Sequence, residues 1–247
     1  MSYATAHRTL ALAIFLAVIP AAAQTTAPEA SVSTPPAVTA APTFSQSPQQ
    51  SFPRVSGLAD KAVEALVNKQ LATRERADRT TRTNCLNAFV SHGKPTYSEL
   101  VRLAYLSPRL LSVDVRVSDY CGGPYPNANT PYPLTFDLAT GRELDWHRFF
   151  IDSFLNPPAD RPSALLALYL SHAALDEDCS SAVNDRSTTF DFWFDSAHKA
   201  VIAHPNSLPH AAESCAKLVP LPFAEIAPYV LSPAHRQDLL TPPAASK

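Results

Sequence analysis

The stretch LLSVDVRVSDYCGGPYPNANTPYPLTFDLATGREL, residues 110–144, contains two candidate strands joined by an irregular loop. In its first part Val113, Val115 and Val117 alternate with polar residues, which is the period-2 pattern of a half-buried strand. A second strand is expected over residues 132–138, and a turn follows it. Strands of this kind indicate a sheet that has one face on a hydrophobic core.

Helices are expected on both sides of this strand region. Apolar residues recur at helical spacing over residues 57–77. Pro162 suits the first turn of a helix that runs to about Asp176, which would place the acidic residues 176–178 at its C-terminal end. Further strands are expected over 99–105, 190–194, 200–203 and 217–221, and short helices over 146–154 and 223–230. The sequence therefore predicts an α+β fold, a single domain with an antiparallel sheet flanked by helices.

The N-terminal region has the features of an export signal. Arg8 is the one basic side chain before an apolar run of signal-peptide length, which ends at Ala21-Ala22-Ala23. We expect a signal peptide over residues 1–23, cleaved before Gln24, and a periplasmic or secreted protein; an uncleaved anchor is the alternative. Residues 24–56 are rich in Pro, Ala, Thr and Ser and are expected to be a disordered linker. Residues 57–240 would form the globular domain.

Four cysteines, an even number in an oxidising compartment, indicate two disulfides. Three connectivities are available, and the sequence does not choose among them. We expect Cys85–Cys121 and Cys179–Cys215, because each pair then falls within one half of the domain. A cysteine metal site is the alternative, but the chain has no C-x-x-C spacing.

Motifs of common enzyme classes are absent from the sequence. It contains no G-x-S-x-G, no H-E-x-x-H and no dinucleotide fingerprint, and its five glycines leave no glycine-rich cofactor loop. We therefore expect neither a cofactor nor a catalytic residue. The net charge of −2 is too small to indicate nucleic acid or a membrane surface as partner.

Three regularly spaced histidines, His198, His204 and His210, are the candidates for metal or acid–base chemistry. Two of them adjoin prolines, so hydrogen-bonded loop histidines are the favoured interpretation, and no metal is expected. The alternative is a cell-wall hydrolase that uses His204 or His210 with an acidic partner. Convergence of the three rings with a carboxylate in a cleft would favour that enzyme.

One segment resembles a known family. Gly122-Gly123 precedes Pro126-Asn127, and a strand with the pattern F-D-x-x-T-G follows over residues 136–141. Together with the chain's end, Leu218-Val219-Pro220-Leu221-Pro222-Phe223-Ala224-Glu225-Ile226, these pieces resemble the RsiV/PdaC-type C-terminal domain, an extracytoplasmic family of unknown function. That domain binds lysozyme in the anti-sigma factor RsiV and is the non-catalytic part of the peptidoglycan deacetylase PdaC. The resemblance covers about residues 97–231, but Tyr125 stands where the family has a histidine.

The resemblance implies an envelope binding domain for a wall-active enzyme such as lysozyme or for peptidoglycan. Tyrosines supply contact area at low entropic cost and also stack on sugars, so they do not separate the two ligands. The predicted binding residues are those of the loop and its flanks: Tyr120, Gly122, Gly123, Tyr125, Asn127 and Tyr132. The second alternative to this function, after the hydrolase, is a structural envelope protein with no small ligand.

Overall fold

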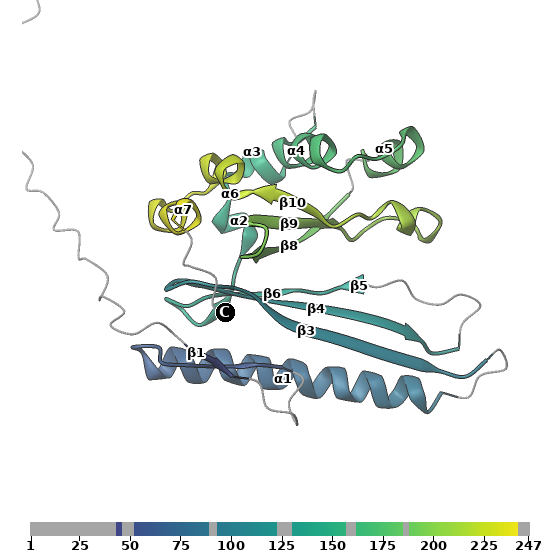
Figure 1. The fold of residues 1–247 in the computed structure, drawn as a ribbon, viewed down its shortest axis with the longest axis horizontal. Coiled ribbons are helices and arrows are strands. Elements are labelled where there is room, and N and C mark those ends of the chain that lie inside the picture. The colour runs from purple at the N-terminus through teal and green to yellow at the C-terminus, as the bar shows by residue number, and fades with distance from the viewer. Residues whose placement is uncertain are drawn as a thin grey trace, which may run out of the picture. The chain divides into compact units, whose positions relative to one another are not determined.

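The computed structural model describes residues 43–45, 52–88, 93–122, 130–156, 162–184 and 188–241. The expected signal peptide, residues 1–23, lies outside these ranges. The structure confirms the α+β class, because antiparallel sheets carry helices on their outer faces (Figure 1). None of the helices in the described ranges combines the length and the apolar character that a membrane crossing requires.

The first sheet is built on a long hairpin. Its strands, in spatial order, are β3 (Thr96–Leu106), β4 (Leu110–Tyr120), β6 (Leu134–Asp137) and β7 (Arg142–Glu143), and β5 (Thr130–Pro131) also pairs with β4. The hydroxyl of Ser107 holds the hairpin turn by accepting hydrogen bonds from the backbone N–H groups of Arg109 and Leu110. The predicted strands over 99–105, 110–117 and 132–138 all lie in this sheet.

One face of the first sheet packs against the long helix α1 (Lys61–Leu86). Asp60 caps the helix, since its carboxylate accepts hydrogen bonds from the N–H groups of Ala62 and Val63. The helix is longer than the predicted segment, 57–77. Between helix and sheet lies a hydrophobic core that includes Val63, Val67, Leu71, Leu111, Val113, Val115, Leu134 and Phe136.

The expected linker, 24–56, contains residues that belong to the fold. Phe52 and Val55 are buried in the core under α1, and β2 (Arg54–Ser56) pairs with β1 (Thr43–Ser45). The side-chain amide of Asn68 completes this contact, because it bonds both the N–H and the carbonyl of Val55. The boundary at residue 56 is therefore corrected, since two apolar side chains anchor a segment whose average composition is that of a spacer.

The second sheet is smaller and lies under a group of short helices. Its strands are β8 (Phe190–Asp195), β9 (Ala200–Pro205) and β10 (Val219–Pro222), in the order β10-β9-β8. The helices are α2 (Trp146–Phe149), α3 (Asp152–Leu155), α4 (Ala164–His172), α5 (Glu177–Val183), η1 (His210–Cys215), α6 (Phe223–Ile226), η2 (Ala227–Tyr229) and α7 (Pro233–Leu240). They enclose a core rich in aromatic side chains. Of these helices, α7 lies in a segment where the sequence did not predict a helix.

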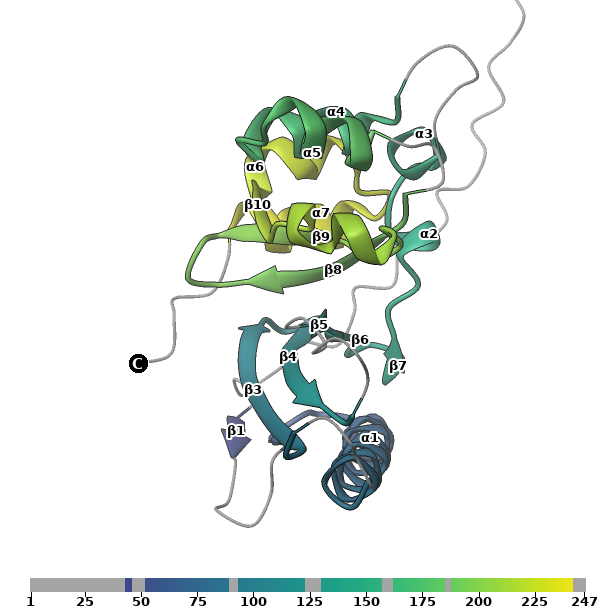
Figure 2. The same ribbon diagram turned by 90° about the vertical axis from the view of Figure 1, so that its right-hand side faces the viewer.

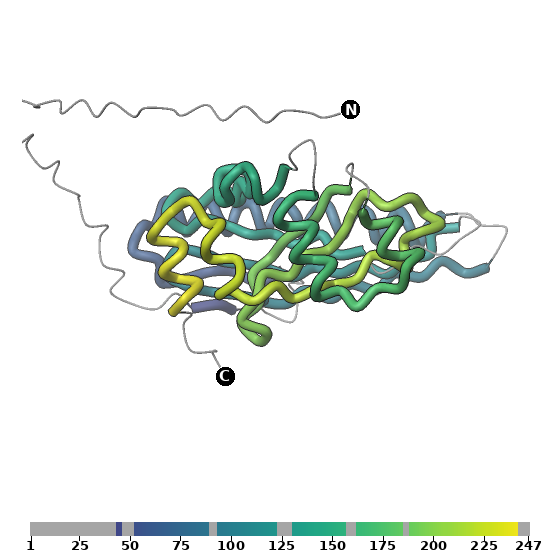
Figure 3. Tube along the Cα trace, turned by 90° about the horizontal axis from the view of Figure 1, so that it is seen from above, coloured from purple at the N-terminus to yellow at the C-terminus, as the bar shows by residue number. Residues whose placement is uncertain are grey.

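The two sheets face each other, so that helix, sheet, sheet and helices form successive layers (Figure 2). In Figure 3 the green and yellow C-terminal half overlies the blue and teal N-terminal half. A small apolar cluster of Ala104, Trp193 and Ile202 lies between the sheets, and Tyr105 and Leu110 of the first sheet pack in the core of the second.

The acidic residues 176–178 do not end a helix, as expected, but begin one. The predicted helix from Pro162 runs over α4 and stops at His172, with Ser163 as its cap. Asp176 then caps α5 by accepting a hydrogen bond from the N–H of Cys179, and Glu177 and Asp178 lie in the first turn. Negative charge at a helix N-terminus is favourable, so the run stabilises α5.

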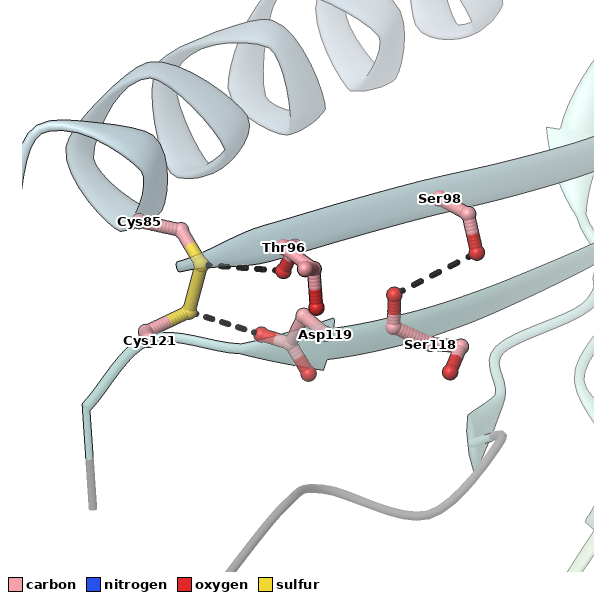
Figure 4. The surroundings of a disulfide bond; sticks show 6 residues. All are labelled: Cys85, Thr96, Ser98, Ser118, Asp119 and Cys121. Atoms are coloured by element: carbon pink, nitrogen blue, oxygen red, sulfur yellow. Dashed lines mark hydrogen bonds between the residues drawn. A yellow bond between two sulfur atoms is a disulfide. The ribbon is translucent and has the colours of Figure 1, made fainter. Parts of the chain in front are cut away.

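The disulfide pairing Cys85–Cys121 and Cys179–Cys215 is confirmed, each pair separated by 36 residues. The first joins the last turn of α1 to the end of β4, where the carboxylate of Asp119 lies 3.1 Å from the sulfur of Cys121 (Figure 4). The second joins α5 to η1. Disulfides of this kind indicate an oxidising, extracytoplasmic environment.

Candidate functional site

The loop predicted to bind a ligand is only partly described by the structure. Tyr120 is the last residue of β4, and Gly122 has a positive φ of 101°. Gly123, Tyr125 and Asn127 lie outside the described residues. Their proposed role therefore stays a prediction.

Tyr132 lies on the other face of the first sheet from Tyr120. It is half-buried under α1, with the guanidinium of Arg74 4.6 Å from its ring centre. Its hydroxyl donates a hydrogen bond to Oε1 of Glu99 at 3.4 Å. Even-numbered residues of β4, including Tyr120, point away from α1, because Val113 and Val115 point toward it. The two tyrosines therefore do not share one exposed surface.

Two carboxyl groups meet beside Tyr132, one from α1 and one from β3. Burial raises the pKa of Asp78 and of Glu99, and the charge of Asp78 raises that of Glu99 further. Burial and the same two acids also raise the pKa of Tyr132. Arg74, 3.8 Å from Asp78, partly offsets the repulsion. We refer to Asp78 and Glu99 as the acid pair.

Charged side chains join the two sheets on the opposite face of β3 and β4. Asp114 on β4 and Asp195 on β8 are fully buried, and Nη2 of Arg102 lies 2.8 Å from a carboxylate oxygen of each. Nη2 of Arg116 lies 2.9 Å from Asp114 as well. Buried charges are tolerated when they are paired in this way. The network fixes the position of Arg116.

Asp195, the last residue of β8, also contacts His198 in the turn that follows the strand. Its Oδ1 lies 2.9 Å from Nδ1 of His198 and accepts a hydrogen bond from the backbone N–H of the same residue. Burial opposes ionisation of Asp195, but hydrogen bonds from Arg102 and His198 outweigh it and lower its pKa. Asp195 is therefore ionised at neutral pH.

At one end of the network the sheets separate to form a cleft of about 550 Å³. We call it the inter-sheet cleft. The residues that line it are Ser98, Glu99, Leu100, Arg116, Ser118, Pro131, His204, Ala216 and Leu218. The size is typical of small-molecule sites. Leu100 and Leu218 are 53% and 36% exposed, so the cleft has an apolar rim.

His204 is the buried polar group of the inter-sheet cleft. It is 8% exposed, and its Nδ1 has no hydrogen-bond partner. Burial, and then the nearby charge of Arg116, lower its pKa to about 4. The ring is therefore neutral at physiological pH, with one nitrogen as donor and one as acceptor.

Comparison with known proteins identifies the fold but not the family. A structure of a DUF3298 family member from Bacteroides fragilis is 12% identical, with a TM-score of 0.51, and the match covers 77% of this chain and 87% of that one. This chain therefore has the fold of a protein from an uncharacterised domain family. A DUF3298 family protein from Pseudomonas aeruginosa is 13% identical over 73% of this chain and 84% of that one, with a TM-score of 0.39. No family model and no curated protein matches the sequence.

The three candidate histidines lie in three different settings. His198 contacts Asp195, His204 lies in the inter-sheet cleft, and His210 lies 3.1 Å from Glu213 at the start of η1. In the described ranges, the side chains of Cys85, Asp119 and Cys121 place their possible ligand atoms close enough together to hold a metal ion. The two sulfurs form a disulfide and offer no thiolate.

The sequence analysis missed Arg116 as a site residue and assigned His204 to a loop, although it lies within β9. The available signal was the pair of charged residues, Asp114 and Arg116, at alternate positions of a valine-rich strand. That pattern is also typical of an ordinary solvated face. Only the second sheet, which covers this face, distinguishes the two.

Proposed function

We propose that this chain is an exported cell-envelope protein whose domain binds peptidoglycan in the inter-sheet cleft. The observation that carries the proposal is the cleft itself, a concave site with an apolar rim and with Arg116 and His204 in its wall. Its volume suits a fragment of a polymer, whereas protein partners usually require a broad surface. A wall-active enzyme such as lysozyme is therefore the less favoured ligand.

Rigid placement of the polar groups supports a binding role. Arg116 is held by Asp114, Asp114 is held by Arg102, and Arg102 is held in turn by Asp195. A side chain that is fixed before the ligand arrives loses less conformational entropy on binding. The resemblance to the RsiV/PdaC-type domain supports the choice of peptidoglycan as the ligand.

Two features support the proposed periplasmic or secreted location. The sequence begins with a segment that has the pattern of a signal peptide. The two disulfides require oxidising conditions to form and persist. Both features agree with a protein that meets the cell wall.

Co-sedimentation of the exported chain with insoluble peptidoglycan tests the proposal. Wild-type protein should sediment with the polymer, and Leu100→Asp, at the rim of the cleft, should remain in solution. Leu231→Asp is the matched control, because Leu231 is 51% exposed and does not line the cleft. It should sediment like the wild type.

A parallel pull-down with lysozyme separates the two ligands. Binding to lysozyme without binding to peptidoglycan would overturn the proposed ligand. Sedimentation of Leu100→Asp at the wild-type level would overturn the proposed cleft. Tyr125→Ala, assayed beside these variants, tests the loop that the sequence analysis predicted.

A further inference from the structure

We propose that the inter-sheet cleft recognises the C-terminal carboxylate of a short peptide with small apolar side chains. This inference rests on the proposed function and deepens it, because it names the end of a stem peptide as the part of peptidoglycan that enters. The argument depends on which hydrogen-bonding groups the cleft presents and on what surrounds them.

Arg116 presents a second donor edge to the cleft. Its Nε and Nη2 atoms lie 2.9–3.2 Å from the carboxylate oxygens of Asp114, which occupies one edge of the guanidinium. Its Nη1 has no hydrogen-bond partner among the described residues, and the side chain is 32% exposed. Arginine can bind a carboxylate through two parallel N–H groups, and the Nη1–Nη2 edge has that geometry.

His204 adds a neutral donor beside this cation. Its unpartnered Nδ1 is enclosed and near the charge of Arg116. A lone pair is more stable than an N–H group next to a cation, so we infer that the proton is on Nε2. The Nε2–H group is then the donor of this ring, and a ligand carboxylate oxygen in the cleft would accept a hydrogen bond from it.

The hydroxyl groups and walls of the cleft restrict what accompanies the carboxylate. Ser98 and Ser118 are opposite each other on β3 and β4, with Oγ of Ser98 3.4 Å from the carbonyl of Ser118 (Figure 4). Leu100 and Leu218 leave apolar surface at the rim, and Pro131 and Ala216 extend it. Small apolar side chains next to the carboxylate would contact this surface.

Acidic groups near the cleft are turned to other partners. Glu99 lines the cleft with its backbone, because its carboxyl group points to the opposite face of the sheet and lies under α1 beside Tyr132. Asp191, which is directly across from His204 on β8, accepts a hydrogen bond from Asn206 at 2.7 Å and does not line the cleft. The polar side chains that line the cleft on its inner face can therefore all donate to an anion.

Calorimetric titration with two matched probes tests the inference. The probes are N-acetyl-D-alanyl-D-alanine and the same dipeptide with a C-terminal carboxamide. The acid should bind about ten-fold or more tightly than the amide, because only the acid forms charge-assisted hydrogen bonds. Equal binding of the two probes, or binding of neither, would overturn the inference.

Two variants localise the effect. Arg116→Gln should remove the preference for the acid, whereas Arg148→Gln, which removes a charge from an 89% exposed side chain on α2, should retain it. Because Arg116 also pairs with Asp114, Leu218→Asp provides a second test: the new charge at the rim should weaken the acid more than the amide. An undiminished preference in both cleft variants would overturn the site.

The outcomes also separate this inference from the proposed function. Wild-type protein that sediments with peptidoglycan but binds neither dipeptide would overturn the carboxylate site alone. Protein that prefers the acid but does not sediment would overturn peptidoglycan as the ligand and support the carboxylate site.

Discussion

Asp114 and Asp195 lie on different sheets, and each places a carboxylate oxygen 2.8 Å from the same nitrogen atom, Nη2 of Arg102. Both carboxylates are fully buried, whereas the side chain of Arg102 is 36% exposed. One guanidinium therefore pairs with two buried carboxylates from strands that are distant in the sequence. The ion pairs of Arg102 therefore connect the first sheet to the second.

Substitution of Arg102 by Met should destabilise the domain strongly. It leaves Asp195 with His198 alone and Asp114 with Arg116 alone. Removing one partner of a buried ion pair costs about 3–5 kcal/mol, and the partial exposure of Arg102 places the expected loss near the lower value. Urea unfolding measures it, with Arg148→Met as the exposed control, expected to change stability by less than about 0.5 kcal/mol. If Arg102→Met loses no more unfolding free energy than the control does, Arg102 does not stabilise the contact between the sheets.

The acid pair should make the domain less stable as pH rises from about 4 to neutrality. The folded-state pKa values of Asp78 and Glu99 are raised, chiefly by burial. A raised pKa means that the folded state binds these protons more tightly than the unfolded state does. The resulting stabilisation is complete below the unfolded pKa values, roughly 4, and is lost as pH rises through the folded ones.

Glu99→Gln should therefore raise the melting temperature at pH 7 and have a smaller effect near pH 4. Asp78→Asn should act in the same direction, and the double variant should gain less than the sum, because either change alone removes the repulsion. Thermal unfolding across this pH range measures all three. Lower melting temperatures at pH 7 in both single variants would show that the carboxylates attract other groups more than they repel each other.

The sequence predicts the paired strands well because they depend on local patterns. It predicts two disulfides because the number of cysteines is even. Alternating valines define the β4 strand wherever it lies in the fold. The same pattern suggested a solvated polar face, yet Asp114 on that face is fully buried. Which face a second sheet covers depends on contacts between residues about 80 positions apart, and no local period records them.

The candidate cleft was beyond prediction for the same reason. Its polar groups come from β3, β4 and β9, and its apolar rim comes from β3 and the segment before β10. His204 adjoins a proline, which favoured a loop, but Pro205 pairs with Phe190 at the end of a strand. Only the register of β8 and β9 places this ring between the sheets.

The turn after β6 should depend on a glycine at position 141. Gly141 has a φ of 68°, and a Cβ there would lie 3.2 Å from the carbonyl oxygen of Val63 and 3.3 Å from the side chain of Leu66. Alanine would be strained in this conformation and would press on α1, so Gly141→Ala should cost about 1–2 kcal/mol or more.

Gly141→Asn separates the two causes. Asparagine tolerates positive φ better than alanine does, but its Cβ meets the same atoms. A smaller loss in the asparagine variant would assign the cost to the backbone, and an equal or larger loss would assign it to the contact with α1. Chemical unfolding of both variants gives the comparison, and a neutral Gly141→Ala would contradict the close approach.

Each disulfide should stabilise the domain by constraining the unfolded chain. A loop closed over 36 residues corresponds to about 3–4 kcal/mol in the chain-entropy model. The paired variants Cys85→Ser with Cys121→Ser, and Cys179→Ser with Cys215→Ser, should each lose about this much in urea unfolding. Because the two bonds lie in different layers, their effects should add to within about 0.5 kcal/mol.

Reduction of the wild-type protein provides the control for these cysteine variants. Dithiothreitol should lower wild-type stability by about the sum of the two losses and should affect each paired variant only through its remaining bond. Peptide mapping without reductant should recover Cys85 with Cys121 and Cys179 with Cys215. Since Cys121 directly follows β4, whose Ser118 and Arg116 line the cleft, loss of that bond should also weaken ligand binding. If the variant with both Cys85→Ser and Cys121→Ser unfolds like the wild type, α1 and the end of β4 are held together by packing alone.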